Sequence, residues 1–451
     1  MGDTESVSSL GPKEVSQRES VVEINRSLIE GSIEVPGSKS YTNRALVIAG
    51  LANGISRITN GLAGDDAVSM VSGLQALGVE IVDESGPGLS KSWSVVGNSG
   101  NLPDRPILID ADLAGTTLRF LSAVALLGRG DVTITGRGPL LKRPVGPLLT
   151  ALRQCGGNVH GSGEFGEYAP VIVGKRSHRL GGSVLVDASK SSQFVTAMLL
   201  IAPYFDDDLV LAHHGLGARG FIEVTVELME RHGVSVSESE NGFRVPAGIV
   251  YQAADERIPP DASAASHMFT LAVASGGEVT VPDLQLAELQ PDYSILDVLE
   301  EFGARVSRLP GGDVSVAAPE RLRPVDIDLA LMPDQLSNVA VLAALAPGTS
   351  RIRGVAITRF HETDRIAAVA SELGKAGVEV EVGEGDVRVR GRGRLHGGTF
   401  RTYHDHRMAM SLAALAAAIG GSRIDGAEAV SKTYQTFWAD AASLGLDWNP
   451  I

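Results

Sequence analysis

The sequence predicts an α/β protein built from six copies of one unit, arranged as two domains of three copies each. A helix that ends at a glycine and continues into a short β-branched strand recurs roughly every 70 residues, which is a fixed internal period. A second, Ala/Leu-rich helix that also leads into a strand keeps the same period. A unit of this length exceeds a solenoid or propeller repeat and has room for a β-α-β-α-β-β subdomain.

The glycines mark the units in order along the chain. A glycine just past a helix end can take the left-handed conformation that other residues avoid, so it is a reliable boundary signal. The glycines of the first kind are Gly78, Gly156, Gly233, Gly303, Gly377 and Gly445. Those of the second kind are Gly54, Gly128, Gly276, Gly348 and Gly420, and the third copy has Phe205–Asp208 instead. Ile258-Pro259-Pro260, between the third and fourth copies, predicts the hinge, because two prolines do not continue a helix.

Composition limits the kind of partner. The 451 residues carry a net charge of −15 and only 5% aromatic residues, which argues against nucleic-acid and membrane-surface binding. A single cysteine, Cys155, excludes an intrachain disulfide framework and any site with several cysteine ligands. Residues 1–20 are polar and resemble no signal peptide. We therefore expect a cytoplasmic protein with a flexible tail over residues 1–20.

Polar and charged residues gather at the start of the first helix of each unit. Backbone N–H groups and the helix dipole favour anions at such a position, and six helix starts can converge on one cleft by pseudo-symmetry. The segments are 38–44, 114–119, 187–193, 261–266, 333–338 and 403–407. The segment 38–44 is not a Walker A loop, because Ser38 stands where that motif has glycine before its Lys39. For Asp261 and Ser263 ordinary helix capping is the simpler interpretation.

Several arginines fit an anion site better than a solvated helix. Arg44, Arg119 and Arg407 lie near helix starts, where the dipole repels a cation unless an anion offsets it. The segment 359–365 adds an imidazole, two carboxylates and two guanidiniums, and on a helix His361 and Arg365 would share a face. A salt-bridged surface helix is the alternative interpretation of that segment.

Together these residues resemble the 5-enolpyruvylshikimate-3-phosphate synthase family of enolpyruvyl transferases. The resemblance runs from about residue 22 to about residue 440 and rests on motifs in the order of that family. The motifs are PGSKSYTNRAL, AGTTLRF, KRPVGPL, SSQF, HETDR, DHRMAM and SKTY. It implies two inverse α/β-barrel-like domains, each of three β-α-β-α-β-β repeats, with the active site in the cleft between them. The expected domains are 37–258 on the shikimate 3-phosphate side, and 21–36 with 259–451 on the phosphoenolpyruvate side.

The resemblance also implies the reaction and its residues. The enolpyruvyl group of phosphoenolpyruvate moves to the 5-hydroxyl of shikimate 3-phosphate and phosphate leaves, with no metal and no other cofactor. The implied shikimate 3-phosphate ligands are Lys39, Ser40, Arg44, Ser191, Ser192, Gln193, Asp334 and His361. The implied phosphoenolpyruvate ligands are Lys39, Gly115, Arg143, Gln193, Arg365, Arg407 and Lys432. Asp334 is implied as general base and Glu362 as the acid that protonates the methylene carbon, with Lys39 and His361 assisting. We expect a monomer that closes on its substrates and is inhibited by glyphosate, because Gly115 and Thr116 keep the small residues of sensitive enzymes.

Four positions depart from the family pattern. His361 stands where the family often has lysine, and imidazole can titrate near neutrality. Ala218 and Phe221 replace a serine and a tyrosine that help to bind shikimate 3-phosphate, and Arg219 is a candidate replacement. Ile357 replaces an asparagine. Two rivals stay open: a UDP-amino-sugar enolpyruvyl transferase, which usually has a reactive cysteine, and a non-catalytic phosphometabolite-binding protein. Cys155 precedes Gly156-Gly157 at a helix end, which favours a buried structural thiol.

Overall fold

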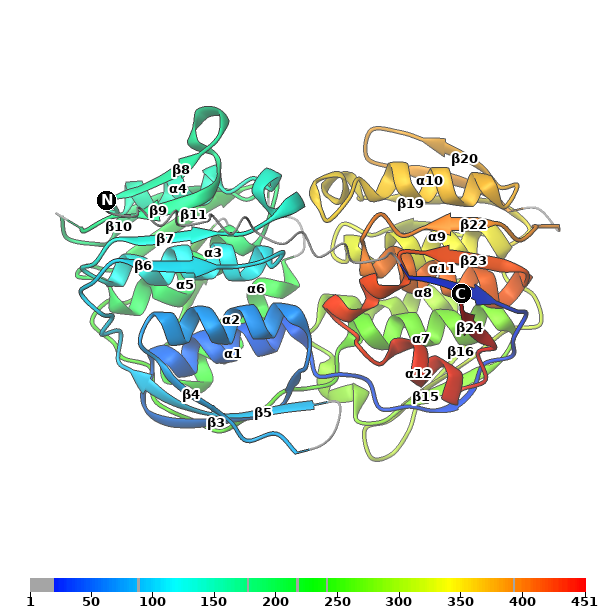
Figure 1. Ribbon diagram of the computed structural model, residues 1–451, viewed down its shortest axis with the longest axis horizontal. Helices are drawn as coiled ribbons and strands as arrows, with labels where there is room; N and C mark the ends of the chain where they lie inside the picture. The colour runs from blue at the N-terminus through cyan, green and yellow to red at the C-terminus, as the bar shows by residue number, and fades with distance from the viewer. Residues whose placement is uncertain (1–19, 87–89, 177, 216–218, 241, 392–393) are drawn as a thin grey trace, which may run out of the picture.

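The computed structural model describes residues 20–451 except 87–89, 177, 216–218, 241 and 392–393. Two lobes lie side by side (Figure 1), and each has its own cluster of buried apolar residues. The first cluster draws on residues between Tyr41 and Ile258, and the second on residues from Val22 to Val35 and from Ala262 to Leu446. We use "first lobe" and "second lobe" for these two parts, and we propose 37–258 and 21–36 with 259–451 as the domain boundaries.

Six four-stranded sheets confirm the predicted repeat. In each unit the strand order across the sheet is first, second, fourth, third, and only the first two strands are parallel. The first lobe contains β14 (Glu256–Arg257), α1 (Lys39–Leu51), β3 (Asn53–Leu62), α2 (Asp65–Ala76), β4 (Glu80–Asp83) and β5 (Ser90–Asn98). Its second unit has β6 (Ile107–Asp110), α3 (Gly115–Val124), β7 (Val132–Thr135), α4 (Gly146–Gln154), β8 (Val159–Ser162) and β9 (Tyr168–Val173). Its third has β10 (Gly182–Asp187), α5 (Gln193–Ile201), β11 (Leu209–His214), α6 (Gly220–Arg231), β12 (Ser237–Ser239) and β13 (Gly242–Val245).

The second lobe repeats the same order of elements. Its first unit has β2 (Glu30–Ser32), α7 (Ala262–Ser275), β15 (Glu278–Val281), α8 (Ile295–Glu301), β16 (Arg305–Arg308) and β17 (Val314–Ala317). Its second has β18 (Asp326–Asp328), α9 (Leu336–Leu345), β19 (Gly348–Arg353), α10 (Arg365–Lys375), β20 (Glu379–Val382) and β21 (Val387–Gly391). Its third has β22 (Thr399–Arg401), α11 (His406–Ile419), β23 (Ser422–Asp425), α12 (Phe437–Ser443), β24 (Trp448–Pro450) and β1 (Val21–Ile24).

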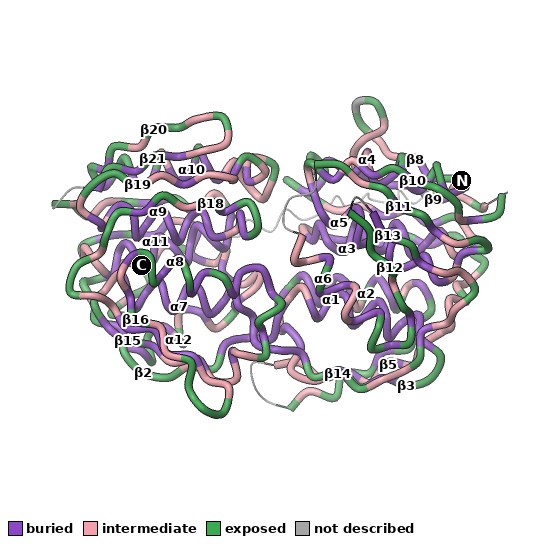
Figure 2. The backbone as a smooth tube through the Cα atoms, turned by 180° about the vertical axis from the view of Figure 1, so that it is seen from behind, coloured by how far each residue is buried: buried purple, intermediate pink, exposed green. Residues whose placement is uncertain are grey.

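The predicted helix boundaries agree with the structure. The six first helices begin within three residues of the starts that the sequence indicates, and all six glycines of the first kind have positive φ angles, from 85° to 109°. These helices carry long apolar runs because they fill the centre of each lobe, while the sheets cover the outside. Figure 2 shows this as buried helices inside a partly exposed shell.

Three strands are supplied from a distant part of the chain. β1 is the fourth strand of the last sheet, between β23 and β24, and β2 is the first strand of the sheet that contains β15. β14, from near residue 256, is the first strand of the sheet that contains β3 and pairs with β3 in parallel. In Figure 1 the dark blue N-terminal strand therefore lies among the red elements of the second lobe. The N-terminal segment thus closes two sheets that the C-terminal part leaves incomplete.

The strand β1 gives a test of this closure. Ile24 is fully buried, whereas Glu23 on the same strand is half-exposed and pairs only loosely with Arg423, at 3.6 Å. We expect Ile24→Ala to lower the free energy of unfolding by about 2–5 kcal/mol, the range for a large-to-small change in a core. Glu23→Ala is the matched control and should change it by less than ~0.5 kcal/mol. Denaturant titration of both variants measures the difference, and equal effects would contradict the role of β1 in the core.

The two chain segments that pass between the lobes run side by side. Ser38 N–H donates to Pro259 O (2.9 Å) and Asp261 N–H donates to Pro36 O (2.8 Å), on either side of a bridge between Gly37 and Pro260. A Cβ on Gly37 would lie 1.7 Å from Asn60 O, so only glycine allows this close approach. The predicted hinge at 258–260 is therefore one of two crossings that are fixed to each other.

Candidate active site

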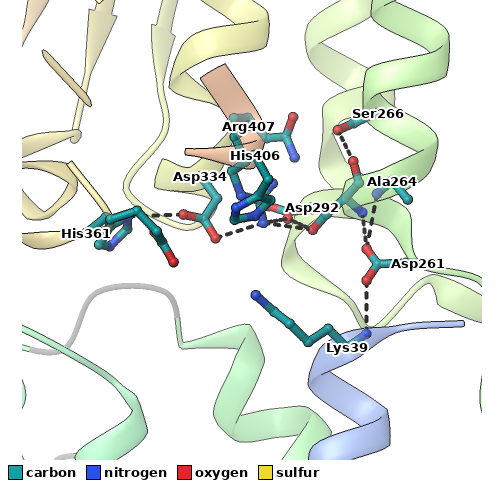
Figure 3. Close-up of polar contacts among 12 residues, drawn as sticks. Lys39, Asp261, Ala264, Ser266, Asp292, Asp334, His361, His406 and Arg407 are labelled. Carbon is teal, nitrogen blue, oxygen red and sulfur yellow. Dashed lines mark hydrogen bonds and ion pairs between the residues drawn. The ribbon is translucent and has the colours of Figure 1, made fainter. Parts of the chain in front are cut away.

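A polar cleft lies between the lobes and is lined from both sides. Thirteen of the fourteen residues that the resemblance implies line it: Lys39, Ser40, Arg44, Gly115, Arg143, Ser191, Ser192, Gln193, Asp334, His361, Glu362, Arg365 and Arg407. The fourteenth, Lys432, reaches the cleft through Glu362, because its Nζ lies 2.6 Å from Oε1 of that side chain. Figure 3 shows Lys39 of α1 pointing into the cleft towards the side chains of the second lobe.

One carboxylate holds the starts of two helices together at the floor of the cleft. Asp261 accepts hydrogen bonds from Ser263 N–H and Ala264 N–H at the start of α7, and from Lys39 N–H (3.0 Å) at the start of α1. The predicted cap at Asp261 is confirmed. Ser263 is not a cap; its hydroxyl contacts Asp292 and accepts from Arg407 Nη2 at 3.2 Å.

The first-lobe wall contains two buried guanidiniums with no carboxylate partner among the described residues. Burial lowers the pKa of Arg44 to about 10, and its nitrogens donate only to neutral oxygens, including Thr225 Oγ1 (2.8 Å) and Phe221 O (2.9 Å). Burial, reinforced by Arg143, lowers the pKa of Arg119 to about 9. Burying an uncompensated cation is costly, so this wall is preorganised for an anion.

Arg119 also orders the residues beside it. Its Nη1 donates to Gln193 Oε1 at 2.7 Å, and Gln193 Nε2 donates to Thr116 Oγ1 at 3.2 Å. These bonds fix the amide of Gln193, at the start of α5, against the start of α3 in the neighbouring unit. The sequence indicated Arg119 as unusual, but it did not assign Arg119 a place in the site.

The second-lobe wall is organised around Arg365, which is 1% exposed. Its nitrogens donate to Asp405 Oδ2 (2.7 Å), Asp334 Oδ1 (2.6 Å) and Glu362 Oε2 (3.0 Å), and Nη1 lies 3.1 Å from His361 Nδ1. Burial alone would lower the pKa of Arg365, but the three carboxylates raise it. α10 begins only at Arg365, so the predicted helical spacing of His361 is wrong. His361 and Glu362 reach this guanidinium from an irregular turn that precedes α10.

Arg407 links Asp334 to a second buried carboxylate. Its Nη2 lies 3.0 Å from Asp334 Oδ2 and 3.5 Å from Asp292 Oδ2 (Figure 3). Burial raises the pKa of Asp292, which is 1% exposed. No sequence motif includes Asp292, which lies in the short turn Pro291–Ser294.

A strained turn places the start of α11. Tyr403 and His404 both have φ near 56°, a left-handed conformation that non-glycine residues rarely adopt. The Tyr403 hydroxyl donates to buried Glu372 at 2.6 Å, and Glu372 also accepts from Arg401 N–H at 2.9 Å. These bonds hold the turn and hence the positions of Asp405 and Arg407.

The two residues that the resemblance implies as base and acid, Asp334 and Glu362, are held as carboxylates by neighbouring cations. Burial alone would raise the pKa of Asp334, yet Arg407 and Arg365 hold it well below its ordinary value. Burial likewise opposes ionisation of Glu362, but Lys432, Arg143 and Arg365 hold its pKa well below the usual range. Arg143 Nη1 comes from the first lobe and lies 3.5 Å from Glu362 Oε1. Asp334 and Glu362 therefore form ion pairs with the same cations that could bind an anionic ligand.

Other expectations have plain outcomes. Arg219 pairs with Glu238 and, at 3.6 Å, with Glu223, and it does not line the cleft, so it does not replace the lost hydroxyls there. Ala218 lies outside the described residues. Cys155 is buried, and burial raises its pKa to about 12, which confirms a structural thiol. No helix in the described part of the chain is long and apolar enough to cross a membrane.

Comparisons with known proteins agree with the geometry. A family model described as EPSP synthase (3-phosphoshikimate 1-carboxyvinyltransferase) matches residues 24–440. The 3-phosphoshikimate 1-carboxyvinyltransferase of Methanoculleus marisnigri is 37% identical over 422 residues, covering 93% of this chain and 97% of that protein. That of Kocuria rhizophila is 39% identical over 425 residues, covering 92% and 94%.

Solved structures show the same fold. The EPSP synthase of Acinetobacter baumannii matches with a TM-score of 0.80 at 23% identity, over 96% of this chain and all of that one. The enolpyruvyl transferase NikO of Streptomyces tendae matches with a TM-score of 0.75 at 19% identity, over 96% of this chain and 99% of that one. The predicted fold class, two α/β parts with a cleft between them, is confirmed.

Proposed function

The chain belongs to the EPSP synthase family, and from this premise we propose how its cleft carries out the family reaction. The enzyme transfers the enolpyruvyl group of phosphoenolpyruvate to the 5-hydroxyl of shikimate 3-phosphate and releases phosphate. This reaction is a step of the shikimate pathway, which leads to chorismate and the aromatic amino acids. The observation that carries the proposal is the pair Asp334 and Glu362, held as carboxylates among cations from both lobes.

The shikimate 3-phosphate side is assigned mainly to the first lobe. Lys39, Ser40 and Arg44 hold the substrate at the start of α1, and Ser191 and Ser192 bind its 3-phosphate at the start of α5. The uncompensated charge of Arg44 supports this, because a phosphate supplies the anion that the buried guanidinium lacks. Asp334 contacts the hydroxyls from the opposite wall, and His361 lies beside it, with Nδ1 3.2 Å from Asp334 Oδ1.

The phosphoenolpyruvate side is assigned to cations that meet at Glu362 and Asp334. Arg143, Arg365, Arg407 and Lys432 are placed to take a phosphate and a carboxylate, for which the bidentate guanidinium fork is suited. Gly115 and Gln193 complete this side, and Lys39 lies between both substrates. The distances from Lys432 and Arg143 to Glu362, 2.6 and 3.5 Å, support one shared anion position.

The proposed chemistry moves one proton onto carbon and back. Asp334 accepts the proton of the 5-hydroxyl while the oxygen of that hydroxyl attacks C2 of phosphoenolpyruvate. Glu362 donates a proton to the methylene carbon C3. In the second half, the bond between C2 and the phosphate oxygen breaks, and Glu362 takes a proton back from C3 to form the enol ether. The proton that Asp334 accepted from the 5-hydroxyl leaves with the phosphate, which returns both side chains to the protonation states in which they began the reaction. Lys39, Arg143 and the other cations stabilise the phosphate as it departs.

Gly115 offers a prediction about phosphoenolpyruvate binding. A Cβ at this position would lie 2.8 Å from Nη1 of Arg143, so alanine must displace the guanidinium, which is the movable end of a flexible side chain. We expect Gly115→Ala to raise the KM for phosphoenolpyruvate by about 10-fold, as one charge-assisted hydrogen bond weakens, and to weaken inhibition by glyphosate. Steady-state kinetics and inhibition assays measure both effects.

The control for this variant is Gly374→Ala in α10, where an added Cβ meets nothing within 4 Å. Its kinetic constants should match those of the wild type. An unchanged KM for phosphoenolpyruvate in Gly115→Ala would show that Arg143 does not hold that substrate.

One assay separates the proposed function from its rivals. Phosphate release from phosphoenolpyruvate is measured with shikimate 3-phosphate and then with a UDP-amino sugar. Release only with the first supports the proposal, release only with the second supports the sugar transferase, and release with neither supports a binding protein. The high pKa of Cys155 already weakens the sugar alternative, because a reactive cysteine needs an accessible thiolate.

We propose that the enzyme works as a cytoplasmic monomer that closes on shikimate 3-phosphate. One chain supplies both walls of the cleft, and the ligand's phosphate would complete charge pairing from both sides. Solution scattering with and without shikimate 3-phosphate tests the mass and the closure together. A mass of two chains would contradict the monomer. A scattering profile that shikimate 3-phosphate leaves unchanged would contradict the closure.

A further inference from the structure

We propose that Lys190 is a further ligand for the 3-phosphate of shikimate 3-phosphate, in place of the hydroxyl contact that is lost at Phe221. This inference rests on the proposed function and adds to it a residue that the family motifs do not include. It concerns the segment between β10 and α5, where Lys190 directly precedes Ser191 and Ser192.

The first argument is that Lys190 makes no hydrogen bond or ion pair with any residue that the structure describes. Seven Lys and Arg side chains line the cleft: Lys39, Arg44, Arg119, Arg143, Lys190, Arg365 and Arg407. Six of them make at least one hydrogen bond or ion pair with the described residues, whereas Lys190 makes none. The carboxylate of the same segment, Asp187, accepts from Ser189 N–H (3.0 Å) and lies 3.7 Å from His214 Nδ1. Hydrogen bonds from Ser189 lower the pKa of Asp187 most, whereas Lys190 contributes only a minor part of the lowering and forms no ion pair with Asp187. The ammonium of Lys190 is therefore available for an anion.

The second argument is the asymmetry of charge between the two walls. The first-lobe wall carries five cations and one carboxylate, Asp66, whereas the second-lobe wall carries two cations and four carboxylates, namely Asp261, Asp292, Asp334 and Glu362. An anionic substrate is therefore attracted to the first lobe before closure. Lys190 stands beside the two serines at which the phosphate is proposed to bind, so its positive charge adds to the hydrogen bonds that their hydroxyls can donate.

The third argument is the contact of Lys190 with the opposite wall. Its Nζ lies 6.0 Å from the ring centroid of Phe360, which belongs to the second lobe and is 48% exposed. A cation–π contact at such an exposed site is weak, while a hydrogen bond from an ammonium to phosphate is stronger. The ammonium can therefore exchange its contact with Phe360 for a hydrogen bond to the phosphate. Because Phe360 belongs to the second lobe, Lys190 reaches both walls of the cleft.

The other candidates on this side of the cleft are already engaged. Phe221 offers no hydroxyl, and its backbone oxygen accepts from Arg44. Arg219 is turned to Glu238 and Glu223, outside the cleft. Among the described Lys and Arg side chains that line this wall, Lys190 is the one that makes no hydrogen bond or ion pair.

The experiment compares Lys190→Met with Lys190→Arg and with Lys175→Met, an exposed lysine of the same lobe that is outside the cleft. We expect Lys190→Met to raise the KM for shikimate 3-phosphate by roughly 10- to 100-fold, as expected for loss of a hydrogen bond to a charged group. The KM for phosphoenolpyruvate at saturating shikimate 3-phosphate should not change. Lys190→Arg should recover most of the loss, and Lys175→Met should behave like the wild type.

The inhibition constant of shikimate, which lacks the phosphate, separates a phosphate contact from a general effect on the loop. It should be the same for wild type and Lys190→Met if the lysine acts on the phosphate. Equal losses for shikimate and shikimate 3-phosphate, or an unchanged KM for shikimate 3-phosphate, would overturn the inference. Failure of the proposed function would instead appear in the wild type, as no phosphate release with shikimate 3-phosphate.

Discussion

Replacement of Lys39 by methionine is expected to abolish turnover and leave the fold intact. Lys39 begins α1, points into the cleft and is proposed to lie between both substrates (Figure 3). Its loss removes a full charge from the transition state, where phosphate leaves, and we expect kcat to fall by at least ~10³-fold, the order found for key electrostatic groups. Methionine has a similar length and keeps the apolar part of the side chain, so the cleft is not emptied.

The free energy of unfolding should hardly change, because the carboxylate that loses its ion pair, Asp66, keeps the favourable interaction with a helix dipole. Lys39 Nζ lies 3.4 Å from Asp66 Oδ2, and Asp66 sits in the first turn of α2, where the helix dipole also favours its charge. Lys91→Met, which removes a surface ion pair of 2.7 Å with Asp83, is the matched control. Its kcat should equal that of the wild type. Rapid-quench or phosphate-release kinetics measures kcat, and thermal unfolding measures stability. A Lys39→Met enzyme that keeps a tenth of wild-type kcat would refute the proposed role of Lys39 in turnover.

The repeat could be predicted because its signals are local. A glycine after a helix takes a positive φ at low cost, and the six such glycines recur at one spacing, so unit boundaries followed from single residues such as Gly78 and Gly303. The assignment of residues 21–36 to the second domain came only from the resemblance. The pairing of β1 with β23 and β24 joins residues about 400 positions apart, and nothing in the segment Val21–Ile24 specifies its partners.

The site was predictable where a charge violates a local rule. Arg44 and Arg407 stood out because a helix start repels cations. Asp292 and Lys190 did not, because a carboxylate in a short turn and a lysine in a loop break no rule until the fold brings them to the cleft. The four-residue spacing of His361 and Arg365 predicted that the two side chains meet, but it assumed that both lie on one helix. The two do meet, but through a turn before α10 and not along its face.

Glu362→Gln is expected to remove proton donation and with it one limb of the pH profile. Lys432, Arg143 and Arg365 keep the pKa of Glu362 well below its ordinary value, although burial opposes this. Lys432 and Arg143 are also proposed to bind the anionic groups of phosphoenolpyruvate. When phosphoenolpyruvate forms ion pairs with Lys432 and Arg143, these cations stabilise the Glu362 carboxylate less. Together with desolvation in the closed cleft, this raises the pKa of Glu362. The acid is thus formed only with both substrates bound.

The sign of the effect on rate follows from the role of the donor. A general acid must be protonated, so kcat of the wild type should fall as pH rises through the raised pKa of Glu362 in the ternary complex. Glutamine cannot donate this proton, so kcat should drop by about 10²- to 10⁴-fold and the residual rate should lose that alkaline limb. Asp334 still acts as base in the variant, so an acidic limb that reflects Asp334 should remain.

A neighbouring carboxylate provides the control that makes this prediction sharp. Asp364 is two residues away, caps α10 through Ala367 N–H and pairs with Arg359, and it does not line the cleft. Asparagine caps a helix about as well as aspartate, so Asp364→Asn should keep both limbs and a near-wild-type kcat. Because Asp364→Asn alters the same turn, loss of the alkaline limb in Glu362→Gln alone would assign that limb to Glu362. An alkaline limb that persists in Glu362→Gln would mean that another group protonates the methylene carbon.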